Sequence, residues 1–412
     1  MAGTPPGTTP GTPRVLRAMN DRAALDLLLE HGTLSRTKVG KLTGLSKPTA
    51  SQLLVRLEEA GLVVATGTTE GRPGPGAQLY AINPGAGHAA GLDVTPQRIR
   101  AAVADITGAV VGEYELATHG RRSTSVVRQV TEALDGAAKA AGLALADVHR
   151  LVIGTPGAFD PATGRLRYAS HLPGWHSATL LDELAAALPM PFEYENDVNL
   201  VAVAEQRLGA ARGHRDFVLL WNEEGLGGAV VIGGRLHRGF TGGAGEVGFL
   251  PVPGTPLMRQ VTKSNGGGFQ ELAGAQVLPG LARDLGVSDV GSGHYADVAV
   301  TLMERAAGAV EMPDDPAQQP YRDLLDAYAT ALATGLASVV AVLDPELVVL
   351  AGRAITAGGE PLRARVQAEL TELAAPRPRL LMASVPEDPV LRGALESALT
   401  ATREEVFDTT AR

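Results

Sequence analysis

The segment SKPTASQLLVRLEEAG, residues 46–61, repeats its apolar side chains with the period of an α-helix. Four of them recur at positions i, i+3, i+4 and i+7, namely Ala50, Leu53, Leu54 and Leu57. They predict one buried stripe along a helix. Pro48 fits the first turn, where its missing N–H group has no intrahelical partner to lose. The opposite face is short, polar and positive near its start, so this helix packs with one side and presents the other.

Two shorter helical segments precede this one. The first is predicted over NDRAALDLLLEHG, with Asn20 at the N-cap and Gly32 at the C-terminal stop. The second begins at Ser35, turns Val39 and Leu42 inward, and ends at a turn made by Gly44. Two short helices, a glycine turn and a third helix with a polar face predict a helix-turn-helix.

Two strands follow the three helices and suggest a wing. Residues 62–66 and 77–82 are predicted as strands around a tip rich in Gly and Pro, with Arg72 in that tip. A winged helix-turn-helix over residues 14–82 would place the start of its third helix in the major groove of DNA. The candidate DNA contacts are Arg36, Lys41, Ser46, Lys47, Pro48, Thr49, Ser51, Gln52, Arg56 and Arg72. The alternative is a small helical bundle that makes protein contacts.

The charge distribution agrees with a nucleic-acid reader at the N-terminus. Residues 1–85 hold nine Lys and Arg against six Asp and Glu, whereas the rest of the chain holds 27 against 39. A basic head on an acidic body suggests that the head alone meets a polyanion. Residues 1–13 predict a flexible tail without the apolar core of a signal peptide. No long uncharged apolar stretch indicates a membrane span, and the absence of cysteine excludes disulfides, so we expect a cytoplasmic protein.

The remainder of the chain reads as an α/β body after a linker at residues 83–87. Residues 88–94, 98–106 and 109–117 are predicted as consecutive strands, followed by a helix at about 124–141 and another strand. The same order of strands, then alternating helix and strand, recurs after residue 217. We therefore expect a body over residues 88–412 with two α/β lobes of the actin-like, ribonuclease-H-like type.

Five motifs in the body resemble the ROK family, which contains repressors, open reading frames and sugar kinases. They are IGTPGAFDPATG, SHLPGW, YENDVNLVAVAE, GGRLHRGFTGGAGEVGF and GFQE, in that order. With the winged head, the chain resembles the family's sugar-sensing regulators. The resemblance implies effector contacts at Gly157, His171, Asn196, Asp197, Glu246 and Glu271. Asn196 and Asp197 also precede a helix, so helix capping is an alternative role for both.

The phosphate-binding loops of the kinase branch are altered in this chain. The family kinases open the body with Asp-Ile-Gly-Gly-Thr-Lys, whereas residues 93–98 read Asp-Val-Thr-Pro-Gln-Arg, without glycine and with a proline that has no N–H donor. The second loop reads Glu223-Glu224-Gly225, and its carboxylates would repel a triphosphate. We therefore expect no enzyme activity, with Asp197 as the relic of the kinase's catalytic base.

The family's zinc site is altered as well. Its histidine position holds Phe249, and its cysteine positions hold Thr262, Ser264 and Phe269. None of these side chains is an ordinary zinc ligand, so we expect neither a metal nor another cofactor. Packing of Phe249 against Phe269 is a hypothesis for what orders this loop instead.

Together these features predict a DNA-binding regulator, a repressor of carbohydrate-use genes, controlled by a sugar or sugar derivative in the interlobe cleft. The expected partners are a double-stranded DNA operator, the sugar effector and further copies of the chain in a homodimer or homotetramer, without a membrane. Two alternatives stay open at this point. One is an ATP-dependent sugar kinase with an extra domain, and the other is a regulator whose sugar pocket is vestigial.

Overall fold

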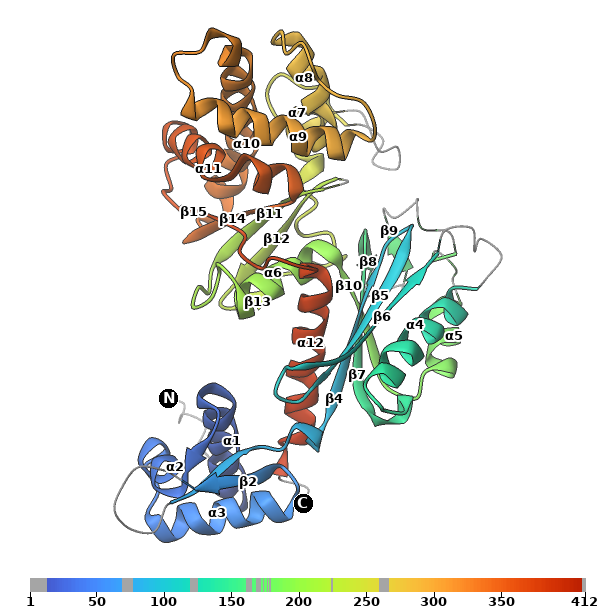
Figure 1. Cartoon of the computed structure of the whole chain (residues 1–412), viewed down its shortest axis with the longest axis vertical. Coiled ribbons are helices and arrows are strands. Elements are labelled where there is room, and N and C mark those ends of the chain that lie inside the picture. Colours follow the sequence, from blue (N-terminus) through green and yellow to red (C-terminus); the bar gives the residue numbers. More distant parts are fainter. Residues whose placement is uncertain are drawn as a thin grey trace, which may run out of the picture.

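The computed structural model describes residues 13–68, 77–118, 125–160, 165–167, 172, 174–175, 177, 179–223, 225–258 and 267–409. Figure 1 shows a small head at one end of the molecule and two α/β lobes above it. Five positions named in the sequence predictions lie outside these ranges: Arg72, His171, Glu224, Thr262 and Ser264.

The head is a winged helix-turn-helix, which confirms the predicted fold of this segment. Its helices are α1 (Pro13–His31), α2 (Arg36–Thr43) and α3 (Lys47–Glu59). Its strands are β1 (Leu34–Ser35), β2 (Val63–Thr68) and β3 (Gln78–Ile82), in the antiparallel order β1-β3-β2. The predicted stripe of α3 is buried, so the helix packs on α1 and α2 with that face.

Local capping explains where the short helices begin and end. The hydroxyls of Ser35 and Ser46 accept the N–H groups of Lys38 and Thr49, and Gly44 ends α2 in a left-handed conformation, with φ of 71°. Two predictions were wrong. Asn20 is no N-cap, because α1 already begins at Pro13, a residue suited to a first helical turn. Leu42 is 40% exposed, so α2 buries Val39 without it.

Both lobes contain a five-stranded sheet with the same strand order. The first lobe has β4 (His88–Val94), β5 (Arg98–Asp105), β6 (Val110–Ala117), β7 (Val148–Thr155) and β10 (Phe192–Asn196), in the order β10-β7-β4-β5-β6. The second has β11 (Phe217–Asn222), β12 (Leu226–Ile232), β13 (Arg235–Leu236), β14 (Leu347–Ala351) and β15 (Arg379–Met382), in the order β13-β12-β11-β14-β15. In each lobe the first strand is central, with two antiparallel strands on one side and two parallel strands on the other. This duplication is the predicted two-lobed, actin-like body.

Helices cover the outer faces of both sheets. In the first lobe these are α4 (Val126–Ala140) and α5 (Leu180–Ala187), beside a small hairpin of β8 (Ala158–Asp160) and β9 (Arg165–Arg167). In the second lobe they are α7 (Gly268–Ala273), α8 (Leu278–Asp284), α9 (Tyr295–Gly308), α10 (Gln319–Leu343) and α11 (Arg353–Leu373). The 3-10 turns are η1 (Pro84–Ala86), η2 (Leu145–Asp147), η3 (Val247–Phe249), η4 (Ala275–Val277), η5 (Ala309–Glu311) and η6 (Pro316–Gln318).

Two helices lie between the sheets and join the lobes. They are α6 (Asp197–Leu208) and α12 (Pro389–Val406), which pack closely on each other. One apolar cluster contains Ala89 of the first sheet, Leu219 of the second, Leu200 of α6 and Ala394 of α12. The lobes therefore share a core, and a change in the angle between them has to involve these two helices.

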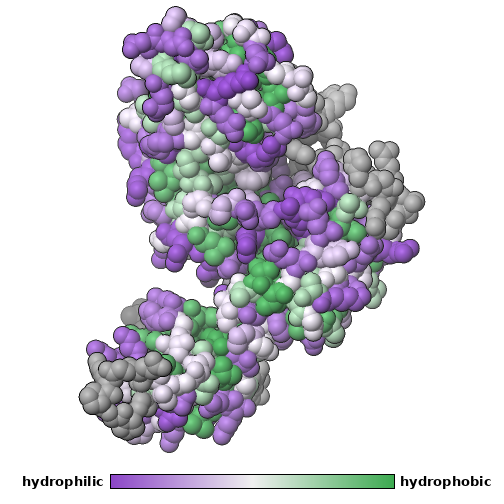
Figure 2. All heavy atoms as spheres, in the orientation of Figure 1, coloured by the Kyte–Doolittle hydropathy of each residue, from purple (hydrophilic) through white to green (hydrophobic). Residues whose placement is uncertain are grey.

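Helix α10 is long and apolar enough to cross a membrane by length and composition alone. In the fold it is the central helix of the second lobe, and Leu324, Tyr328, Leu332 and Leu336 are fully buried in that lobe's core. The surrounding surface of this lobe is mainly hydrophilic on the face in Figure 2. Its apolar sequence is thus explained by burial inside the second lobe.

The far end of α12 enters the head. Val406 and Phe407 are buried in one apolar cluster with Leu25 and Leu54 of the head and Ile106 of the β5–β6 turn. The linker prediction for residues 83–87 falls on η1, beside this contact. The head core is therefore completed by Val406 at the end of α12 and by Phe407 after it. The sequence prediction had assigned both residues to the body.

Candidate effector and DNA-binding sites

The start of α3 presents the predicted DNA-binding residues. Lys47, Pro48, Thr49 and Gln52 are exposed, and Ser51 is half-buried. The hydroxyls of Thr49 and Ser46 lie 2.8 Å apart, so both already take part in the cap of α3. Figure 1 shows α3 at the side of the head that faces away from the lobes. This face is open to a DNA duplex, and Lys41 is exposed on α2.

Two predicted DNA contacts have partners inside the head. The Arg36 guanidinium donates to the Tyr80 hydroxyl, with 2.9 Å from Nε, and lies over the Tyr80 ring. Arg56 donates to the buried carboxylate of Asp21 at 2.6 Å. These bonds tie the wing to α2 and α3 to α1. Contacts of Arg36 and Arg56 with DNA stay predictions, in competition with these structural roles.

In the body, Asn196 and Asp197 stand where β10 ends and α6 begins. The Asn196 side-chain oxygen accepts the N–H groups of Val198 at 2.9 Å and Asn199 at 3.3 Å, so the capping role is present. Its amide nitrogen donates to the Gly157 carbonyl at 3.0 Å. The structure thus brings together three predicted effector residues, Gly157, Asn196 and Asp197, at the carboxyl edge of the first sheet.

The glycine loop, which we define as residues 237–246, approaches the same place from the second lobe. Gly228 of β12 donates to the Gly245 carbonyl at 2.8 Å, and Gly245 leaves no room for a side chain, since its Cβ would lie 2.1 Å from the Gly228 oxygen. The neighbouring Gly227 lies against Val198, the residue after Asp197. Glu246 therefore follows a glycine that packs on β12, the strand that contacts the residue after Asp197. A sugar site shared by Glu246 and Asp197 stays a prediction.

The two predicted carboxylates of the second lobe differ in their surroundings. Burial raises the pKa of Glu246 above its ordinary value. Glu271 is exposed on α7. Its neighbour Gln270 points inward and accepts the Leu226 N–H at 2.6 Å. Sequence reasoning missed Gln270, because GFQE carries no signal that the Gln orders β12.

A charged pair that sequence reasoning also missed joins the two lobes. Arg238 of the glycine loop donates to Glu195 of β10 at 2.6 Å. Glu195 belongs to the YENDVN motif and Arg238 to GGRLHRGF, but their pairing across 43 positions has no local sequence signal.

Residues 95–98, within the segment predicted to be an altered phosphate loop, form a closed turn. Thr95 N–H donates to the Arg98 carbonyl at 2.9 Å, and Arg98 N–H donates to the Thr95 hydroxyl at 3.2 Å. Pro96 between them has no N–H group. The N–H groups of Thr95 and Arg98 are thereby both hydrogen-bonded within the turn itself.

The second segment predicted to be an altered phosphate loop places the carboxylate of Glu223 at a helix N-terminus. Glu223 accepts the N–H of Arg353, the first residue of α11, at 2.8 Å. Helix N-termini bind anions, because their first N–H groups have no intrahelical partner. Here the protein's own carboxylate takes that role.

The carboxyl of Asp93, beside the first loop, should make the stability of the folded protein depend on pH. Burial and the nearby Asp388 raise its pKa to about 6, although Arg100 opposes this. The folded protein thus binds this proton more tightly than the unfolded chain, whose Asp pKa is 3.8. The stability that the protonated carboxyl contributes is therefore fully present below pH 3.8, falls as the pH rises from 3.8 to about 6, and is absent above that. We expect Asp93→Asn to be more stable than wild type at pH 7.5 by about 2–3 kcal/mol, since one pKa unit corresponds to about 1.4 kcal/mol.

This gain should vanish as the pH approaches 4. Urea unfolding between pH 4.5 and 7.5 measures it, with the exposed Asp284→Asn as control. A stability difference between Asp93→Asn and wild type that stays constant over this range would contradict the assignment.

The positions of the family's zinc ligands do not fit a metal where they are described. Phe269 is fully buried, and its ring lies against Gly335 of α10, where an added Cβ would be 2.2 Å from the ring. Its N–H donates to the Leu250 carbonyl at 2.9 Å, which joins α7 to η3. No cluster of three or more His, Asp or Glu side chains in the described part of the chain could hold a metal ion. Direct packing of Phe249 on Phe269 stays a prediction.

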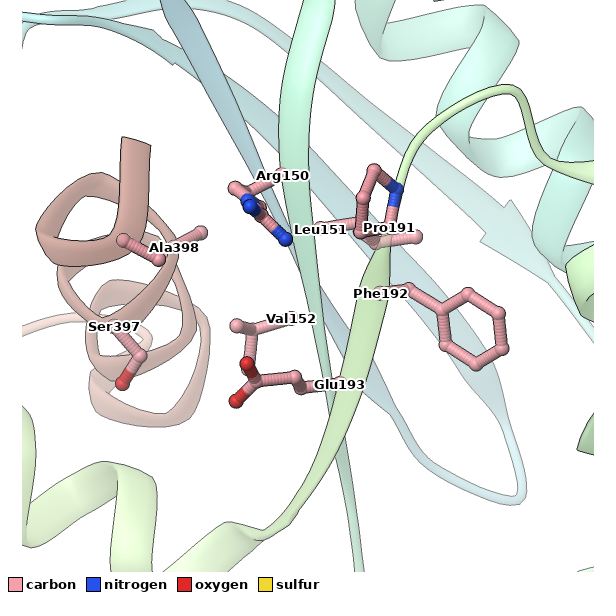
Figure 3. A pocket seen from close by; sticks show the side chains of 9 residues that line it. Arg150, Leu151, Val152, Pro191, Phe192, Glu193, Ser397 and Ala398 are labelled. Atoms are coloured by element: carbon pink, nitrogen blue, oxygen red, sulfur yellow. The ribbon is translucent and has the colours of Figure 1, made fainter. Parts of the chain in front are cut away.

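A cavity of about 50 Å³ lies away from this site, between β7, β10 and α12. Figure 3 shows Arg150 and Glu193 on the strands and Ser397 and Ala398 on α12. The volume suits roughly one or two water molecules at about 30 Å³ each and not a sugar. The nearby ion pair between Arg150 and Glu405, at 2.8 Å, ties the head-proximal end of α12 to β7.

Two family models match the chain. The ROK family matches residues 89–271, and the MarR family matches residues 15–72. The putative xylose repressor of Caldicellulosiruptor sp. (strain Rt8B.4) is 25% identical over 345 residues, which cover 84% of this chain and 85% of that protein. The glucokinase of Thermotoga maritima is 32% identical over 227 residues, which cover 52% of this chain and 68% of that protein.

Solved structures share the fold. A ROK family transcriptional regulator, described as a homologue of the E. coli MLC protein, has a TM-score of 0.70 at 20% identity and covers 95% of this chain and 99% of its own. A ROK hexokinase from Thermus thermophilus has a TM-score of 0.60 at 28% identity and covers 77% of this chain and 99% of its own. At 95% coverage, the match to the regulator includes the head. The match to the hexokinase covers 77% of the chain, about the fraction that the body makes up.

Proposed function

Since the chain belongs to the ROK family and carries a MarR-type winged helix, we propose that it is a DNA-binding repressor of carbohydrate-use genes whose effector is a sugar bound between the lobes. Two relatives, named a putative xylose repressor and a xylose repressor, match over 85% of their own length and support a pentose or hexose as the effector class. The chain would act in the cytoplasm on a double-stranded operator. A homodimer would present two heads to two half-sites of that operator.

One observation carries this proposal: α12 belongs to both the interlobe core and the head core. Ala394 and Ala398 pack between the sheets, whereas Val406 packs in the head. The helix begins after Asp388, which pairs with Arg100 of the first lobe near the closed phosphate turn. A sugar that favours one lobe angle therefore displaces the helix that holds the head, and this links the two sites energetically.

Several contacts speak against a sugar kinase. The Thr95–Arg98 turn uses its amides internally, and Glu223 occupies the N–H at the start of α11. A triphosphate would have to displace the first set of bonds and approach the second carboxylate. Because a relative is named a glucokinase, the experiment also tests for kinase activity.

The experiment is a DNA-binding titration with fragments of the promoters next to the gene, at about 100 mM salt, with D-xylose, D-glucose and N-acetyl-D-glucosamine as probes. We expect specific binding of one fragment, weakened at least tenfold by one of these sugars. A Gln52→Ala variant should lose specificity, and Glu304→Ala, an exposed position on α9, should not. Failure to bind any fragment, or ATP-dependent phosphorylation of a probe sugar, would contradict the proposal. Binding of DNA that no sugar changes would favour the vestigial pocket.

A further inference from the structure

The ion pair between Arg238 and Glu195 joins the two lobes beside the candidate sugar site. Arg238 follows β13 of the second lobe, and Glu195 is the penultimate residue of β10 in the first. The Arg238 Nε donates to the Glu195 Oε2 at 2.6 Å. The Glu195 side chain is 10% exposed and that of Arg238 is 55% exposed. A nearly buried carboxylate of the first lobe thus takes its counter-charge from the second.

Glu195 also organises the start of α6. Its Oε1 accepts the Asn199 side-chain amide at 2.8 Å and the Asn196 N–H at 2.9 Å. Asn196 in turn caps α6 and reaches Gly157. The orientation of the first-lobe half of the sugar site, which includes Asp197, therefore depends on this carboxylate.

Arg238 organises the opposite half. Its carbonyl accepts the Ala244 N–H at 3.1 Å, which closes the glycine loop two residues before Glu246. Gly239 permits the tight return with φ of 73°, a conformation that other residues rarely adopt. One residue thus fixes the loop through its backbone and the other lobe through its side chain.

Removal of the Arg238 charge would leave Glu195 nearly buried without its cation. Loss of one partner of such a pair is costly, because the remaining charge stays desolvated. Lysine replaces this arginine poorly, since the bond comes from Nε, part of a rigid planar group that an ammonium does not reproduce. The expected relief is a shift of β10 and the glycine loop apart from each other.

We propose that Arg238 is a positioning residue that holds the two halves of the effector site at the separation that sugar binding requires. This inference rests on the proposed function, since it assigns a role within the same site. Arg238 acts through Glu195 on Asn196 and Asp197, and through the glycine loop on Glu246. It sets the sugar affinity without being needed for contact with DNA.

The test compares Arg238→Gln and Arg238→Lys with Arg235→Gln, an exposed arginine of β13, as matched control. Calorimetry with the three probe sugars gives the effector Kd, and a fluorescent operator fragment gives the DNA Kd without sugar. We expect Arg238→Gln to weaken binding of the effector sugar at least tenfold, and we expect Arg238→Lys to lose less of this affinity. Without sugar, the DNA Kd of each variant should stay within twofold of the wild-type value. A general structural defect would change this Kd as well.

A double-mutant cycle and hydrogen exchange separate the possible results. The double variant Glu195→Gln/Arg238→Gln should bind the sugar only slightly more weakly than either single variant, because both changes remove the same ion pair. Without sugar, amides of residues 196–200 and 238–247 should exchange faster together in Arg238→Gln. Unchanged sugar affinity and exchange overturn the role of Arg238 and leave the proposed function intact. If wild type binds none of the probes, the proposed function fails, and the exchange comparison alone then supports or overturns the interlobe role.

Discussion

Phe407→Ala should uncouple the head from the sugar site. The side chain is 1% exposed in the head core, and loss of a buried Phe costs about 3–5 kcal/mol. The Arg22 guanidinium lies 5.7 Å from the ring centre, so a cation–π contact is lost as well. The head keeps its own helices and wing but loses its docking on α12. We expect operator affinity to fall at least tenfold, because in the proposed homodimer two loosely tethered heads would no longer match two half-sites. We expect the remaining DNA binding not to respond to the sugar.

The sugar affinity of the same variant should change less than twofold, because Phe407 follows the end of α12 opposite to Ala394, which packs between the two sheets. Calorimetry and operator titration on one preparation measure both quantities. Val342→Ala, at an 83% exposed position on α10, is the control for a lost apolar side chain. A Phe407→Ala protein that releases DNA on sugar addition as wild type does would show that the signal reaches the head without α12.

Glu205→Ala should destabilise the junction of α6 and α12 more than any surface change. Glu205 is fully buried in α6. Its carboxylate accepts the N–H groups of Ala210 at 2.7 Å, Ser384 at 2.9 Å and Val385 at 2.8 Å, so it pins the segment that leads from β15 to α12. Removal takes this acceptor from three partly buried hydrogen bonds. Since a hydrogen bond to a charged group contributes about 1.5–3 kcal/mol, we expect a loss of about 3–5 kcal/mol.

Urea unfolding followed by circular dichroism measures this loss. Glu205→Gln should fall between wild type and Glu205→Ala, because an amide keeps one acceptor for the same segment. Glu304→Ala on the surface of α9 should stay within about 0.5 kcal/mol of wild type. A Glu205→Ala protein as stable as that control would show that the carboxylate does not hold the start of α12.

The parts of the fold that sequence reasoning predicted are those with a local signal. The stripe of α3, the Ser46 cap and the Gly44 turn all act within a few residues, and the structure has each of them. The start of α1 was misplaced, since Asn20 has the chemistry of a cap but lies in a segment that can continue the helix back to Pro13. Local preference there yields to packing of the whole helix in the head.

The parts that sequence reasoning missed depend on pairings between distant residues. No local pattern in the sequence indicates that Phe407, after α12, completes a core made by residues such as Leu25. Likewise, the motifs predicted that Asp197 and Glu246 belong to one site, whereas the Arg238–Glu195 pair that braces it became visible with the fold. The sugar contacts of Asp197, Glu246 and Glu271 stay predictions.

The linkage between sugar and DNA tests the central claim most directly. Calorimetry should determine the Kd of the effector sugar for the free protein and for the protein saturated with its operator fragment, at one salt concentration. If α12 couples the sites, the sugar binds more weakly to the DNA-bound protein, by the same factor by which the sugar weakens DNA binding, and at least tenfold. Equal sugar Kd values with and without operator would contradict the account, because the two sites would then be independent.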